Sequence, residues 1–111
     1  MIGVLLLLGA CTTPAAPQEW AGVSTDANGD RALALRLNRA GTRAFGEYTV
    51  GVSTGALEGT IENGSIFAEL TAGPTCTYQF QGSMTESVLT GSYSPDDCAG
   101  GLAGTWNLSR P

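Results

Sequence analysis

The sequence predicts an all-β domain, a small antiparallel up-and-down barrel of about eight strands that follows a short apolar segment and a proline-containing tether. Three observations support this fold class. The chain is rich in turn formers, with 16 glycines and 5 prolines among 111 residues. Apolar residues recur at every second position in short runs, as in half-buried strands. Turn signals separate these runs at regular intervals, and a chain of this length forms one domain.

The expected strands follow one another from Trp20 onward. The run with Leu33, Leu35 and Leu37 on one face could also form a short helix, but turn residues before it and Gly41 after it favour a strand. Asn63-Gly64 is the strongest turn signal, because a two-residue type I′ hairpin needs positive φ at both positions. The eight expected strands are 20–24, 33–37, 45–50, 57–61, 66–70, 75–82, 87–93 and 102–109.

An inward glycine between two large residues marks three of these strands and favours strand curvature. A meander of eight strands can close on itself and leave no exposed edge; the alternative is a two-sheet sandwich or an incompletely closed barrel. We expect Trp20 and Trp106 to pack together where the first and last strands meet. The three glycine patterns are Leu57-x-Gly59-x-Ile61, Leu89-x-Gly91-x-Tyr93 and Leu102-x-Gly104-x-Trp106. The side chains expected to fill most of the interior are Phe45, Tyr78, Phe80, Tyr93 and Trp106.

This pattern resembles the small eight-stranded meander barrels of the streptavidin and lipocalin kind, in architecture only. No biotin-site constellation is present, and the chain around Trp20 lacks the lipocalin Gly-x-Trp signature.

The N-terminus contains a candidate export signal. The apolar run from Ile2 to Ala10 is far shorter than the ~20 residues that span a bilayer, but it has the length of a signal-peptide core. It ends in Leu8-Gly9-Ala10-Cys11, which resembles the lipobox of bacterial lipoproteins. The resemblance implies that residues 1–10 are a lipoprotein signal peptide, that diacylglycerol is attached to the Cys11 thiol, and that cleavage precedes Cys11. The alternative is an apolar N-terminal strand that ends in a buried cysteine.

Two further details concern the start of translation and the membrane to which the protein is sorted. No Lys or Arg precedes Cys11, which predicts that translation starts upstream of Met1. The residue after the cysteine is Thr12 rather than Asp, and the resemblance then favours the outer membrane, facing the periplasm, over the inner membrane. Residues 11–19 contain Pro14 and Pro17 and are expected to form a tether that reaches up to ~25 Å, so the barrel domain is expected at 20–111.

Cys76 and Cys98 are the remaining cysteines, and an exported protein meets an oxidising compartment, which predicts a disulfide between them. A loop of this size contributes about 3.4 kcal/mol in the chain-entropy description. A metal or redox role for the pair is the alternative, but a metal site needs further ligands and the chain has no His.

Composition excludes several classes of function. The net charge is −5 and the five arginines are scattered, so no basic face is available for nucleic acid. The absence of His and Lys removes the commonest general base and every Schiff-base route. Asp96-Asp97 and Asp26-Ala27-Asn28-Gly29-Asp30 could each suggest calcium, but both are better explained as turns. Glu58, Glu62 and Glu69 are expected to face solvent.

These observations predict a lipid-anchored envelope lipoprotein with a non-catalytic barrel domain that binds a ligand or serves a structural role. We expect no metal or cofactor, and a monomer that is attached to the membrane by its lipid. The alternatives are a hydrolase that uses two converging carboxylates, and an inhibitor of a host or periplasmic enzyme. A bound partner would be a protein at the loops or a small apolar molecule in the interior.

Overall fold

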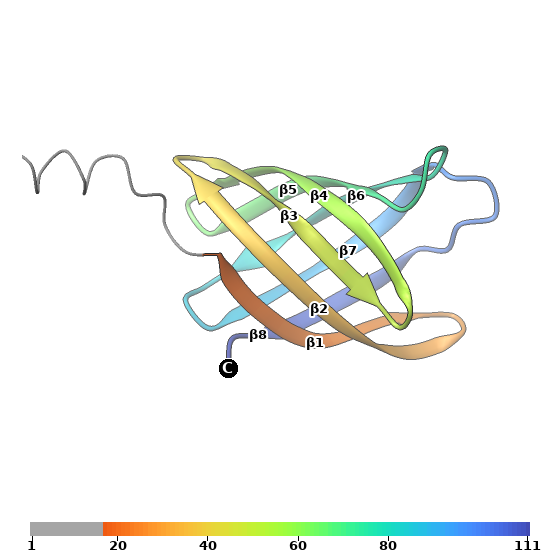
Figure 1. The fold of residues 1–111 in the computed structure, drawn as a ribbon, viewed down its shortest axis with the longest axis horizontal. Helices are drawn as coiled ribbons and strands as arrows, with labels where there is room; N and C mark the ends of the chain where they lie inside the picture. Colours follow the sequence, from red (N-terminus) through yellow and green to blue (C-terminus); the bar gives the residue numbers. More distant parts are fainter. Residues whose placement is uncertain (1–16) are drawn as a thin grey trace, which may run out of the picture.

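In the computed structural model, which describes residues 17–111, the chain forms a closed barrel of eight antiparallel strands (Figure 1). Each strand pairs with the next, and β1 also pairs with β8, so the expected meander barrel is confirmed and the sandwich and the open barrel are wrong. Residues 1–16, with the expected signal peptide and Cys11, lie outside the described residues. The strands are β1 (Gln18–Asp26), β2 (Gly29–Ala40), β3 (Arg43–Val50), β4 (Ser53–Glu62), β5 (Ser65–Thr71), β6 (Thr77–Met84), β7 (Val88–Asp97) and β8 (Gly104–Ser109).

Several strands extend beyond the runs that the alternation marks. β2 continues on both sides of its leucines, because its polar ends still complete backbone hydrogen bonds with β1 and β3. β1 begins at Gln18, and Gln18 and Glu19 pair with Leu37 and Arg36. The last two residues of the expected tether are therefore part of the barrel wall.

The turn between β4 and β5 has the expected geometry. Asn63 has φ of 52° and Gly64 has φ of 78°, as a type I′ turn requires. Ile61 lies directly opposite Ile66, and both side chains are buried. The register of this hairpin is thus set by its turn and by its apolar pair.

The barrel interior is a packed core over most of its length. Each buried leucine contributes about 1.5–3 kcal/mol relative to an exposed one. The core consists of Trp20, Leu33, Leu35, Leu37, Ala44, Tyr48, Leu57, Ile61, Ile66, Ala68, Leu70, Phe80, Leu89, Trp106 and Leu108.

Trp106 lies at the centre of an aromatic cluster. Its ring centroid is 5.2 Å from that of Tyr48 and 5.0 Å from that of Phe80, separations at which aromatic pairs attract. Strands β1 and β8 do meet as expected, but their register places Trp106 opposite Ser24 rather than opposite Trp20. The two tryptophans accordingly belong to different parts of the interior.

Two of the expected inward glycines allow close approaches. A Cβ at Gly59 would come within 2.0 Å of the Phe67 carbonyl oxygen, and one at Gly91 within 2.5 Å of the Phe80 ring. Glycine at these positions lets neighbouring strands and a large ring come close to the strand backbone.

The expectation that Phe45 fills the interior is wrong. Ala44 and Tyr48 of β3 face inward and are buried, so the period of two puts Phe45 on the outer face, where it is 40% exposed. The Arg43 guanidinium lies 5.9 Å from its ring centroid and also binds the Glu58 carboxylate at 3.0 Å. The three glutamates expected outside, Glu58, Glu62 and Glu69, are exposed.

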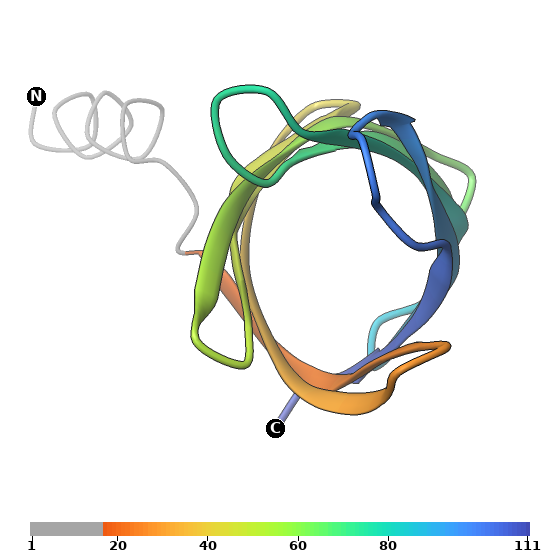
Figure 2. The ribbon, with the colours of Figure 1, turned by 90° about the vertical axis from the view of Figure 1, so that its right-hand side faces the viewer.

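The barrel has two unlike ends. One end, called here the tether end, carries the start of β1, the C-terminal residues and the β2–β3, β4–β5 and β6–β7 turns (Figure 1). The other, called the open end, carries the β1–β2, β3–β4, β5–β6 and β7–β8 connections and faces the viewer in Figure 2.

Candidate functional site at the open end of the barrel

A cavity of about 360 Å³ opens to solvent at the open end, and we call it the cup. Trp106 and Leu70 lie at its base, and both side chains are buried in the core. Three tyrosines, from β3, β6 and β7, contribute to its wall. The lining residues are Ser24, Asp26, Arg31, Tyr48, Val50, Ser53, Thr54, Leu70, Ala72, Cys76, Tyr78, Tyr93, Gly100, Gly101, Leu102 and Trp106.

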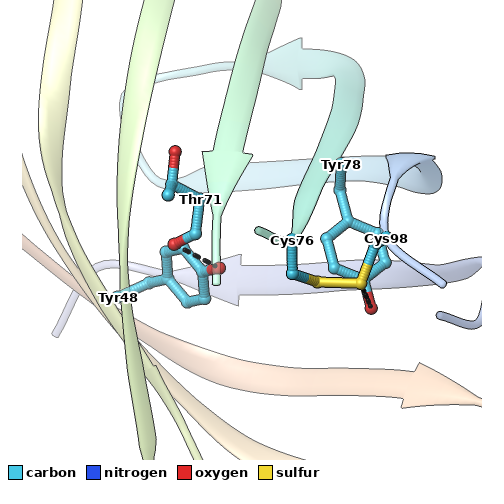
Figure 3. Close-up of a disulfide and its surroundings, with 5 residues drawn as sticks. All are labelled: Tyr48, Thr71, Cys76, Tyr78 and Cys98. Carbon is cyan, nitrogen blue, oxygen red and sulfur yellow. Dashed lines mark hydrogen bonds between the residues drawn. A yellow bond between two sulfur atoms is a disulfide. The ribbon is translucent and has the colours of Figure 1, made fainter. Parts of the chain in front are cut away.

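The tyrosine hydroxyls differ in their partners. The Tyr48 hydroxyl donates to the Thr71 carbonyl oxygen at 3.3 Å (Figure 3). The Tyr93 hydroxyl lies 3.3 Å from the hydroxyl of Ser24, whose side chain is buried. The Tyr78 hydroxyl lies 3.6 Å from Cys98 Sγ, a disulfide sulfur that has no proton and can only accept.

Glycines keep these tyrosines against the wall. Each tyrosine hydroxyl lies where the side chain of a facing glycine would otherwise be, so the ring does not have to point into the cavity. An added Cβ would meet the hydroxyl oxygen at 2.5 Å for Gly55 and Tyr48, 2.8 Å for Gly101 and Tyr78, and 2.4 Å for Gly104 and Tyr93.

The cup has no uncompensated charge in its lining. Arg31 binds the Asp26 carboxylate at 3.2 Å, and the Asn28 backbone N–H donates to the same carboxylate at 2.7 Å. Burial, together with the nearby Tyr78 and Tyr93, raises the pKa of Tyr48 to about 12. The phenol of Tyr48 is therefore a neutral group at physiological pH.

The expected disulfide is present at the rim of the cup. Cys76 and Cys98 are bonded, just before β6 and just after β7 (Figure 3). The β7–β8 connection that follows Cys98 contributes Gly101 and Leu102 to the cup lining. The disulfide thus ties this connection to the β6 side of the rim.

The tether end is closed by side chains. Trp20 is 2% exposed there, and the Arg110 guanidinium lies 5.8 Å from its ring centroid. A depression of about 840 Å³ lies outside this seal, and most of its lining residues are exposed. It ends at the buried Trp20 and Ile61, whereas the cup reaches the aromatic cluster around Trp106.

The acidic turns that could suggest calcium have other partners. Asp26 and Gly29 flank the two-residue β1–β2 turn, and the Thr25 hydroxyl donates to Asp30 at 2.8 Å. Asp96 accepts from the Gln79 side-chain amide at 3.2 Å, in β7 rather than in a loop. Within residues 17–111, no three His, Cys, Asp or Glu side chains are grouped to hold a metal ion.

Sequence reasoning placed two of the cup tyrosines, Tyr78 and Tyr93, in the interior, but not the cup itself. It missed Tyr48, Ser24 and the pair formed by Asp26 and Arg31. A signal was available for Tyr48, because it shares the inward parity of Ala44. The Ser24–Tyr93 contact is between residues 69 positions apart and left no local signal.

The described part of the chain contains no helix long and apolar enough to cross a membrane. Residues 17–111 form one barrel with a filled tether end and a cup at the open end. No protein-family model, curated protein or solved structure matches the chain.

Proposed function

We propose that this protein is a lipid-anchored lipoprotein of the bacterial envelope whose barrel is a non-catalytic module that binds a small molecule in the cup. The observation that carries the proposal is the cup, a cavity of about 360 Å³ with polar groups on an apolar base. Concave sites of this size and composition are where proteins bind small ligands.

The anchor of this proposal is Cys11, through the lipobox Leu8-Gly9-Ala10-Cys11. The disulfide fits an oxidising compartment. β1 starts at the tether end (Figure 1), and a lipid on Cys11 would therefore hold that end toward the membrane and turn the cup away from it. On the outer membrane, which Thr12 favours, the cup opens into the periplasm.

A binding role is favoured over catalysis by the groups that line the cup. Asp26 is its one carboxylate, and it is occupied by Arg31 and a backbone N–H. A carboxylate-based hydrolase uses two acidic groups on either side of its substrate. The chain also has no His or Lys to activate a hydroxyl.

The test of ligand binding compares two tryptophan variants of the exported protein. Ser53 lines the cup at the start of β4, and Ser53→Trp places an indole across the mouth. Thr60→Trp adds the same indole to the exposed outer face of the same strand. Native mass spectrometry should find a bound small molecule in the unmodified protein and in Thr60→Trp, but not in Ser53→Trp. Bound mass in all three, or in none, contradicts a cup ligand.

The anchor has a separate test. Cys11→Ser should abolish metabolic labelling with palmitate and release the chain from the membrane fraction, because the thiol that takes the lipid is gone. Unchanged labelling and membrane retention in this variant refute the lipoprotein assignment.

A further inference from the structure

We propose that the cup binds a compact, uncharged aromatic or heteroaromatic ring that carries a carbonyl oxygen, an inference that rests on the small-molecule function proposed above. Four features of the cup, its depth, its charge, its free hydroxyl donors and its aromatic wall, each restrict the ligand.

The depth of the cup restricts the ligand's length. Beneath Trp106 the interior is filled by Leu35, Leu57 and Phe80, each no more than 2% exposed. A long acyl chain needs an empty shaft along the barrel axis, and this barrel has none below the cup. A volume of about 360 Å³ is at the small end of ligand cavities and suits a compact molecule.

The charges of the cup restrict the ligand's charge. Its lining holds one acidic and one basic side chain, and Asp26 and Arg31 already bind each other at 3.2 Å. A charged ligand would lose water without finding a free counter-charge, which is costly. A neutral ligand avoids this cost.

The hydroxyls of the cup restrict the ligand's polar group. Ser24 and Tyr93 have two hydroxyl protons between them, and their mutual hydrogen bond uses one. The Tyr78 proton faces only a disulfide sulfur, which is a weak acceptor. The Tyr48 proton is already donated to Thr71. Two donors are thus free to meet an acceptor, and a carbonyl oxygen has two lone pairs to receive them.

The wall of the cup favours a ring. The centroids of Tyr48 and Tyr93 lie 5.2 Å and 6.4 Å from that of Trp106, and Leu70 and Leu102 add apolar surface. A flat ring gains contact with aromatic faces and edges. A sugar would instead bring hydroxyls to this apolar part, where they would lose their water without a partner.

The test uses four water-soluble probes of similar size: benzamide, benzoate, benzylammonium and valeramide. Each is titrated into the ¹⁵N-labelled exported protein in detergent, and the two tryptophan indole N–H signals are followed by NMR. Trp106 lies at the base of the cup and Trp20 seals the tether end, so Trp20 serves as an internal control. Benzamide should shift Trp106 but not Trp20, and should bind at least about five-fold more tightly than each other probe, since it alone combines ring, carbonyl and neutrality.

Three variants test the hydroxyls. Tyr78→Phe and the double variant Ser24→Ala, Tyr93→Phe should each weaken benzamide binding by about three- to ten-fold, because each removes one of the two free hydroxyl donors. Thr60→Val removes a hydroxyl from the outer face and should change nothing. Equal affinity in all three variants and the unmodified protein overturns the assignment of the donors.

The probes also separate this inference from the function on which it rests. If benzoate, benzylammonium or valeramide binds at Trp106 as tightly as benzamide, the ligand class is wrong and the cup remains a binding site. If no probe shifts Trp106, the ligand class is also wrong. The comparison of Ser53→Trp with Thr60→Trp then decides independently whether the cup binds a small molecule.

Discussion

The hydroxyls of Ser24 and Tyr93 lie 3.3 Å apart inside the barrel, although β8 separates the strands that carry them. The contact passes over Gly104, the β8 residue opposite Tyr93. A Cβ on Gly104 would lie 2.4 Å from the Tyr93 hydroxyl oxygen and 2.3 Å from the Thr25 carbonyl oxygen. The bond between two walls of the cup therefore depends on a glycine that takes no part in it.

Gly104→Ala should lower the free energy of unfolding by about 2 kcal/mol or more, because the new methyl group overlaps a side chain and the backbone of β1. Urea denaturation monitored by tryptophan fluorescence measures the change. Thr105→Ala, on the exposed face of the same strand, should stay within about 0.5 kcal/mol of the unmodified protein. Equal stability of the two variants would contradict this prediction, because it would show that the β8 backbone shifts at Gly104 without a cost.

Loss of the disulfide should destabilise the domain strongly. The double variant Cys76→Ala, Cys98→Ala should lose about 3 kcal/mol in urea denaturation, as expected for a bond that spans 22 residues. The unmodified protein under reducing conditions should lose a similar amount. If the free energy of unfolding falls by less than about 1 kcal/mol in both measurements, the disulfide does not stabilise the fold by constraining the unfolded chain.

Stability should fall in alkali because of Tyr48. Its pKa is about 12 in the folded protein and about 10 in an unfolded chain, so between these values the unfolded state releases a proton that the folded state keeps. This contribution is fully present below pH 10 and is lost as the pH rises through 12, by about 3 kcal/mol in total.

Tyr48→Phe should flatten this part of the pH profile, which urea denaturation at a series of pH values measures. It also removes the hydrogen bond to Thr71, which costs about 1 kcal/mol at neutral pH. An unchanged alkaline slope in this variant would mean that other groups cause it.

The β4–β5 turn offers a test of backbone conformation. Gly64→Ala should cost about 1 kcal/mol in thermal or urea denaturation, because Gly64 has φ of 78° and alanine is strained there. Asn63→Gly, at the neighbouring position, keeps the turn accessible and should be nearly neutral. If both substitutions cost the same, the cause is not the backbone angle.

The sequence was sufficient for those features that depend on local patterns. The alternation of Leu33, Leu35 and Leu37 places a strand face, and Asn63-Gly64 places a turn, because each signal depends on neighbours along the chain. The pairing of Cys76 with Cys98 also followed from the expected oxidising compartment, because these two cysteines remain once Cys11 is assigned to the lipid.

The side of a strand on which an aromatic residue lies needs more than its hydrophobicity. Phe45 lies outside because Ala44, Gly46 and Tyr48 occupy the inward positions of β3, and a Cβ at Gly46 would meet the Arg36 carbonyl oxygen at 1.9 Å. Residues of a strand alternate between its two faces. Which face points to the core depends on the space that the side chains and backbones of the other strands leave there.

The cup could not be predicted from the sequence for a related reason. Its residues come from strands at both ends of the sequence, and its volume is what remains after Leu35, Leu57 and Phe80 fill the tether side of the interior. The cavity is the part of the barrel interior that the core side chains leave empty, and no local sequence pattern predicts where that part lies.

The pairing of Ala21 with Ser109 closes the wall and brings the start of β1 and the end of β8 together. The strands thus form a ring that a circular permutation can reopen elsewhere. A short linker from Arg110 to Gln18 and a new start at Val52, whose side chain is fully exposed in the β3–β4 turn, keep every strand neighbour. If the proposed lipid anchor were moved to that new start, it would turn the cup toward the bilayer, so the direction in which such an anchored barrel faces depends on where the ring is opened.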